Sequence, residues 1–86
     1  MKLIVVSVYD RASEVFGRPA FIPARGAAIR SFTDEVNRVD ANNELNRHPD
    51  DFDLYILGEF EDSKGIFTVD DNGPVVLVRG KDVVNS

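Results

Sequence analysis

Aromatic and basic side chains are interleaved over residues 9–30, a mixture suited to binding single-stranded nucleic acid. Surfaces that bind unpaired strands combine exposed rings, on which bases stack, with cations that follow the phosphate backbone. The candidate nucleic-acid contacts in this segment are Arg11, Phe16, Arg18, Phe21, Arg25 and Arg30. Tyr9 and Phe21 could instead belong to a hydrophobic core, whereas Phe16 lies in a polar segment where burial is harder to explain.

The charge balance limits how such a surface could work. The chain carries a net charge of −5 at pH 7, which argues against a protein that coats nucleic acid by bulk attraction. Residues 1–47 have seven basic and six acidic side chains, whereas residues 48–86 have three basic and nine acidic ones. Within residues 11–30, four arginines face only Glu14. This excess is either an anion-binding strip or an ordinary solvated surface with a chance run of charge.

Groups for covalent catalysis and metal binding are scarce, and we expect neither an enzyme nor a cofactor. The chain has no cysteine and one histidine, His48, and no serine lies in a Gly-x-Ser-x-Gly turn. The carboxylates of Asp50, Asp51 and Asp53 could hold Mg²⁺ or Ca²⁺, but their spacing matches no EF-hand loop. The first apolar run is too short for a signal peptide or a membrane span, so we expect no membrane contact.

A single amphipathic helix is predicted over residues 27–39. Ile29, Phe32, Val36 and Val39 recur at spacings of three and four, which places them on one stripe. Gly26 would serve as the N-cap. Asparagines and Asp40 in residues 40–43 would fray the other end, because their side chains compete with the helical hydrogen bonds. The apolar stripe is expected to pack on one face of a sheet.

The remaining segments are typical of strands and turns. Strands are predicted at residues 3–9, 20–24, 52–61, 66–69 and 75–78. Residues 10–18 are interpreted as a loop or wide hairpin, and Pro19 and Pro23 place the second strand at an edge. Phe60 is expected on the same face as Leu54 and Ile56. The sequence therefore predicts one α+β domain over residues 1–86, with a mostly antiparallel sheet of about five strands (β-β-α-β-β-β), one helix on one face and a short tail, 80–86, that could be flexible.

Several predicted strands carry apolar residues on both faces, yet one helix can cover only one face. The second face would hold Leu3, Val5, Tyr55 and Leu57, together with part of residues 75–78. Either the sheet closes into a small barrel, or a second copy of the chain covers this face. We expect a homodimer, with Val83-Val84 as an added strand across the interface.

Short segments in a fixed order carry a resemblance to a known family. They are Ser7-Val8-Tyr9-Asp10, Ala28-Ile29-Arg30-Ser31-Phe32 with Asp34 and Asn37, His48-Pro49-Asp50-Asp51-Phe52, Leu54-Tyr55-Ile56-Leu57-Gly58-Glu59-Phe60, Gly65, and Val78-Arg79-Gly80. In this order they cover nearly the whole chain, which resembles the small non-structural protein of gokushovirus-like microviruses. These phages have circular single-stranded DNA genomes.

The resemblance implies a protein that is absent from the capsid and acts in the cytoplasm of the host bacterium. It also implies DNA binding and a role in switching replication from duplex copying to single-strand genome synthesis and packaging. The alternative is a protein–protein adaptor that contacts the phage replication initiator or procapsid proteins without touching DNA. Its acidic segments, residues 50–53 and 59–62, would then dock a basic partner.

Overall fold

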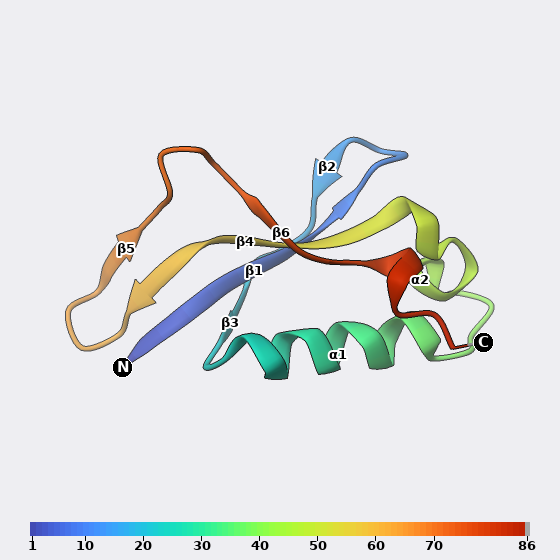
Figure 1. Ribbon diagram of the computed structural model, residues 1–86, viewed down its shortest axis with the longest axis horizontal. Coiled ribbons are helices and arrows are strands. Elements are labelled where there is room, and N and C mark those ends of the chain that lie inside the picture. The colour runs from blue at the N-terminus through green and yellow to red at the C-terminus, as the bar shows by residue number, and fades with distance from the viewer. Residues whose placement is uncertain (86) are drawn as a thin grey trace.

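The computed structural model describes residues 1–85 and has the predicted α+β architecture, with an antiparallel sheet on one side and one main helix on the other (Figure 1). The strands are β1 Lys2–Asp10, β2 Val15–Phe16, β3 Ala20–Ile22, β4 Phe52–Glu61, β5 Ile66–Thr68 and β6 Val75–Arg79. The helices are α1 Arg25–Asn37 and the short α2 Glu44–Arg47, and single 3-10 turns cover Pro49–Asp51 and Gly80–Asp82.

The two long strands, β1 and β4, form the centre of the six-stranded sheet. β2 and β3 both pair with the outer edge of β1, and β5 and β6 both pair with the outer edge of β4. The sheet formed by the described residues stays open, so the barrel alternative is wrong. β3 lies at an edge, as its flanking prolines predicted. Of the two alternatives for residues 10–18, the structure shows the hairpin. β1 extends past β3, so Tyr9 and Asp10 are free to pair antiparallel with β2.

The helix begins and ends two residues earlier than predicted. Ala28, Phe32 and Val36 are buried against the sheet, but Val39 lies beyond the helix and is 88% exposed. The prediction that Val39 belongs to the buried stripe is therefore wrong, and so is the assignment of the N-cap to Gly26, because Ala24 occupies that position. Val6 and Leu54 complete the buried core between α1 and the sheet.

Asparagine side chains stabilise the C-terminal end of α1. Asn43 is 5% exposed, and its amide donates hydrogen bonds to the carbonyls of Glu35 (2.8 Å) and Arg38 (2.9 Å). Asn46 donates to the carbonyl of Val36 at 3.0 Å. The last carbonyls of a helix lack their usual donors within the helix, and these side chains supply donors to them. The Glu35 carbonyl also accepts a hydrogen bond from the backbone N–H of Arg38 at 3.2 Å. Asn43, which was expected to fray the helix, instead caps it.

A β-bulge in β4 changes which face its second half presents. Val5 pairs with Gly58 and Val6 pairs with Ile56, so Leu57 is the extra residue. Beyond the bulge, Phe60 pairs with Leu3 and lies on the face opposite Leu54 and Ile56. The predicted placement of Phe60 is wrong because strict alternation holds only in an unbroken ladder. Gly58 is required here, since a Cβ would overlap the carbonyl oxygen of Thr68.

The C-terminal segment packs against its own domain as far as the structure describes it. After the turn Gly80–Asp82, Val83 contacts the core, and its carbonyl accepts a hydrogen bond from the Asn37 amide at 2.9 Å. Val83 is therefore packed on its own domain in the monomer, and the added strand that Val83-Val84 would form across a dimer interface stays a prediction. Ser86, the end of the predicted tail, lies outside the described residues.

Candidate nucleic-acid interface

The sheet face opposite α1, which we call the open face, is defined by strand register. Ile4, Val6 and Val8 of β1 pack toward the helix, so Leu3, Val5, Ser7 and Tyr9 point to the open face. In Figure 1, β2 and the β5–β6 connection both lie on the side of the sheet away from α1. The open face is therefore flanked by these segments and covered by no helix in the described part of the chain.

Three aromatic rings gather near one end of the open face and form the Tyr9 cluster: Tyr9, Phe16 and Tyr55. The ring centroids of Tyr9 and Phe16 are 4.7 Å apart, and those of Phe16 and Tyr55 are 5.3 Å apart with the planes at 81°. Because Phe16 and Tyr55 come from strands on opposite sides of β1, their contact crosses that strand. Edge-to-face packing of this kind holds the rings in fixed orientations.

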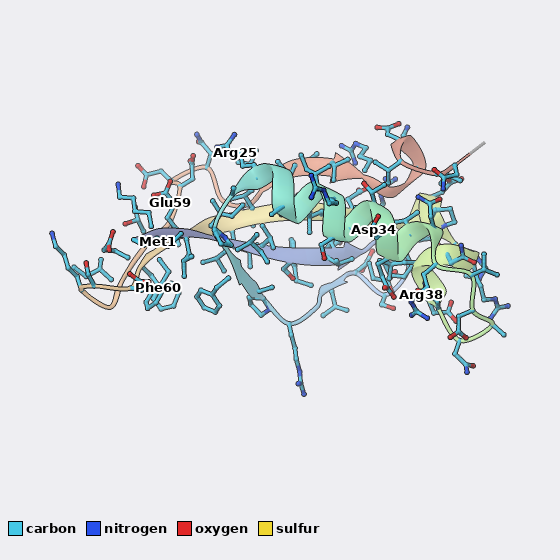
Figure 2. All side chains as sticks on the ribbon, turned by 90° about the horizontal axis from the view of Figure 1, so that it is seen from below. Met1, Arg25, Asp34, Arg38, Glu59 and Phe60 are labelled. Carbon is cyan, nitrogen blue, oxygen red and sulfur yellow. The ribbon has the colours of Figure 1, made fainter. Side chains whose placement is uncertain are left out.

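A second group of three rings, the Phe60 cluster, lies toward the other end and contains Phe21, Phe60 and Phe67. The Phe60 and Phe67 centroids are 4.7 Å apart, and Phe21 reaches Phe60 across β1 at 5.4 Å. Phe67 is 60% exposed. Figure 2 shows Phe60 beside Met1, at the end of the sheet that extends beyond α1. These bridging rings explain why Val5 is only 6% exposed although no helix covers it.

The opposite face of the same end is charged. Where the sheet extends beyond α1, the helix-side positions are Lys2, Glu59 and Glu61, and Lys2 Nζ lies 4.0 Å from Glu59 Oε2. The open face at the same strand positions carries Leu3, Phe60 and Phe67 instead. At this end of the sheet the helix-side face is therefore polar, whereas the open face carries apolar and aromatic residues. An exposed apolar face of this kind indicates a binding surface.

An ion cluster lies next to the Tyr9 cluster. Asp53, the cross-strand partner of Tyr9, is 1% exposed, and its carboxylate accepts hydrogen bonds from Arg11 Nε (3.0 Å), Arg11 Nη2 (3.1 Å) and Arg79 Nη1 (2.9 Å). Arg11 follows β1 and Arg79 ends β6, so three strand termini bring these groups together. Hydrogen bonds to Asp53, and then its negative charge, raise the pKa of Arg11, which therefore stays protonated.

Comparison with known proteins identifies the family. Residues 3–83 match the sequence model described as Phage ORF5 protein. The chain is also 38% identical over 81 residues to Protein ORF5 of Chlamydia phage 1, an alignment that covers 92% of this chain and 84% of that protein. The chain belongs to the Phage ORF5 protein family. The resemblance to a gokushovirus non-structural protein is thereby confirmed. No solved structure matches the chain.

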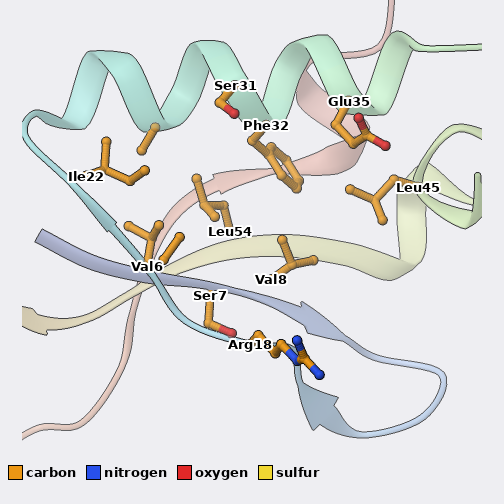
Figure 3. Close-up of a pocket in the computed structure, with 12 residues that line it drawn as sticks. Val6, Ser7, Val8, Arg18, Ile22, Ser31, Phe32, Glu35, Leu45 and Leu54 are labelled. Carbon is orange, nitrogen blue, oxygen red and sulfur yellow. The ribbon is translucent and has the colours of Figure 1, made fainter.

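This member of the Phage ORF5 family brings together only some of the candidate contacts predicted from the sequence. Phe16 and Phe21 both lie on the open face, one in each aromatic cluster, and Arg11 lies beside the first. Arg18 is exposed next to Ser7 at the sheet edge, where it lines the cavity between β1 and α1 (Figure 3). Phe16, Phe21 and Arg11 therefore share one side of the molecule, and Arg18 lies at its edge.

Two of the predicted arginines lie elsewhere. Arg30 is exposed on α1, which covers the other face of the sheet. Arg25 begins α1 and lines a groove of about 550 Å³ between β5 and β6, together with Glu59 and Asp70 (Figure 2). Grouping these arginines with the aromatics rested on their closeness in sequence, and the turn into α1 separates them in space.

Sequence reasoning missed four contributors to the interface: Tyr55, Phe60, Phe67 and Arg79. Tyr55 was assigned to a dimer interface, and Phe60 was placed on the wrong face because the bulge was not recognised. The glycine in Leu57-Gly58-Glu59 is the one local signal for that bulge, since an isolated glycine in a strand pattern marks bulges and close backbone approaches.

The cavity beneath α1 is lined mainly by apolar side chains. A cavity of about 210 Å³ lies between α1 and β1, and Figure 3 shows Val6, Val8 and Leu54 pointing from the sheet toward the helix around it. Among residues 1–85, no three His, Asp or Glu side chains gather as a metal site would require. No helix within the described residues is long and apolar enough to span a membrane.

Proposed function

We propose that this phage protein binds single-stranded DNA on the open face and helps switch genome replication to single-strand synthesis and packaging. One observation carries the proposal. The chain has six phenylalanines and two tyrosines, and all of them except Phe32 and Phe52 gather in the two clusters on the uncovered face. Base stacking on aromatic rings contributes about 1–3 kcal/mol per base, so two clusters can supply most of the affinity.

Unpaired strands fit this face better than duplex DNA. Stacking on a ring requires a base whose face is free, and a base in a duplex is already stacked on its neighbours. The net charge of −5 also disfavours a binding mode dominated by phosphate contacts. The cations near the aromatic rings are few: Arg11 and Arg79 at one end and Arg18 at the edge.

The proposal is tested by fluorescence-anisotropy titration of a labelled single-stranded oligonucleotide. We expect binding that weakens with salt, with a slope of log K against log [salt] set by only a few phosphates, at roughly 0.7 per contact. An oligonucleotide of abasic sites, which keeps the phosphates and removes the bases, should bind much more weakly, and so should a duplex. If none of the three binds at low salt, the proposal is wrong.

The adaptor remains the second candidate, supported by the acidic excess in residues 48–86. Several of the carboxylates it would use already have partners within the chain. Asp53 is buried between two arginines, and Glu61 and Asp62 both bind the amino group of Met1. Pull-down from infected, nuclease-treated cells discriminates between the candidates. Recovery of the replication initiator or procapsid proteins by a protein that ignores oligonucleotides would favour the adaptor. Both candidates act in the host cytoplasm.

A further inference from the structure

We propose that Asp53 positions Arg11 and Arg79 as a clamp for one backbone phosphate of a strand stacked on the Tyr9 cluster. This inference rests on the proposed function and adds to it a phosphate site that includes Arg79. It starts from the placement of Asp53, which is the cross-strand partner of Tyr9 on the open face. A phosphate bound at this cluster would adjoin a base stacked on the rings.

The two arginines converge on one atom. Arg11 Nε lies 3.0 Å and Arg79 Nη1 lies 2.9 Å from the same oxygen, Asp53 Oδ2. Their guanidinium groups are thus close enough to reach a single phosphate together. Two bonds from Arg11 and one from Arg79 fix the orientation of both planes, which reduces the side-chain entropy lost on binding.

The ion cluster of Arg11, Asp53 and Arg79 has positive charge and free N–H donors that a ligand could use. Two arginines and one carboxylate leave a net charge of +1, and no other carboxylate forms an ion pair with either arginine among the described residues. Asp51 contributes negative charge near Arg11 without pairing with it. The arginine side chains are 44% and 41% exposed, whereas Asp53 is 1% exposed. A guanidinium has five N–H donors, so unused donors remain on the exposed side.

Neutralising a buried carboxylate needs only one arginine, so the second is left for another purpose. Arginine is the side chain best suited to phosphate, because its planar fork can bind two oxygens at once. Holding two such forks beside an aromatic cluster combines the two elements that single-strand binding requires.

Substitution combined with salt dependence tests the clamp. In anisotropy titrations, the double variant Arg11→Gln/Arg79→Gln should lower the slope of log K against log [salt] by roughly 0.7, the value for one phosphate on a single strand. Two independent phosphate contacts would lower it by roughly 1.4. The matched control is Arg25→Gln/Arg30→Gln, which also removes two positive charges, both from α1, and should leave the slope unchanged. An equal effect of this control, or no effect of the double variant Arg11→Gln/Arg79→Gln, would overturn the clamp.

Asp53→Asn tests the positioning role, because the clamp and simple net charge predict opposite changes in DNA affinity. Removing a negative charge should tighten DNA binding if only net charge mattered, whereas loss of the anchor should weaken it. Tighter binding would therefore contradict the proposal. If Asp53→Asn or the glutamine variants do not fold, Arg11→Lys/Arg79→Lys carries the test. This lysine variant keeps the ion pairs and the salt slope but loses the planar guanidinium groups. Its affinity for the oligonucleotide should therefore fall, and an unchanged affinity would refute the clamp.

These outcomes separate the clamp from the proposed function. Wild-type protein that fails to bind single strands refutes both. The clamp alone is refuted by a different result. In that result wild-type protein binds single strands and loses affinity when Phe16 is replaced, but the arginine variants keep the full salt slope. The Arg11–Asp53–Arg79 cluster would then serve folding and not DNA binding.

Discussion

Phenylalanine serves two roles in this chain. Phe32 is 4% exposed beneath α1, so Phe32→Ala belongs to the large-to-small core class that costs about 3–5 kcal/mol of stability. Phe67 is 60% exposed and contacts only the edge of its cluster. Composition cannot distinguish the two roles, because the difference lies in which face of the sheet each ring occupies.

Phe16→Ala and Phe67→Ala should each weaken single-strand binding by roughly 1–3 kcal/mol, the cost of losing one stacking partner. Phe67 is 60% exposed and Phe16 is 38% exposed, so we expect both variants to fold, with the smaller loss of stability for Phe67→Ala. The matched control is Val39→Ala, which truncates an apolar side chain that is 88% exposed away from the open face. Anisotropy titration measures the affinity, and urea unfolding checks stability. A loss as large for Val39→Ala as for the two aromatic variants would show that the open face has no special role.

At the scale of elements, apolar runs bounded by turn residues predicted β1, β3, β4, β5 and β6, and a spacing of three and four residues predicted most of α1. The sequence left β2 open as a loop or wide hairpin, and it did not predict α2 or the bulge at Leu57. β2 and α2 are shorter than any window over which periodicity can be judged, and the bulge depends on the pairing of two distant strands. The sequence thus identified Phe16, Phe21 and Arg11 as candidates but could not assemble them with Tyr55, Phe60 and Arg79.

The capping of α1 by distant asparagines gives a prediction at this scale. Asn43→Ala would remove the two hydrogen bonds from its amide to the carbonyls of Glu35 and Arg38, although the Glu35 carbonyl keeps the backbone N–H of Arg38. At about 0.5–1.5 kcal/mol per hydrogen bond, we expect a loss of about 1–3 kcal/mol. Asn42→Ala, one residue earlier and exposed, is the matched control and should change stability little. Urea unfolding monitored by circular dichroism measures both. Equal stabilities of the two variants would show that the Asn43 bonds contribute nothing.

At the scale of the whole molecule, the homodimer and the DNA complex require the same surface. Leu3 and Tyr55, which we expected in a dimer interface, lie on the open face with Phe16 and Phe21, whereas Leu57 lines the groove between β5 and β6. One open face cannot be covered by a second copy and by bases at once. The homodimer therefore stays a proposal for the DNA-free protein, in which self-association would bury the aromatic clusters.

Sedimentation with and without an oligonucleotide checks this competition. DNA-free protein should show a monomer–dimer equilibrium at micromolar concentration, and saturating single-stranded oligonucleotide of a length that fits one face should shift it to a complex with one protein per strand. Phe67→Ala should weaken the dimer as well as the complex, because both use its ring. A dimer that persists unchanged when DNA is bound would place its interface elsewhere on the molecule.

Intrinsic fluorescence gives the most direct test of the DNA-binding face. The chain has no tryptophan, and its two tyrosines, Tyr9 and Tyr55, both belong to the Tyr9 cluster. All tyrosine emission therefore comes from the open face. Bases that stack on this cluster should quench the emission in step with the anisotropy of a labelled strand, after correction with free tyrosine amide for light absorbed by DNA. We predict that tyrosine quenching and the anisotropy of the labelled strand reach their midpoints at the same concentration. Saturated binding with unchanged tyrosine emission would contradict it.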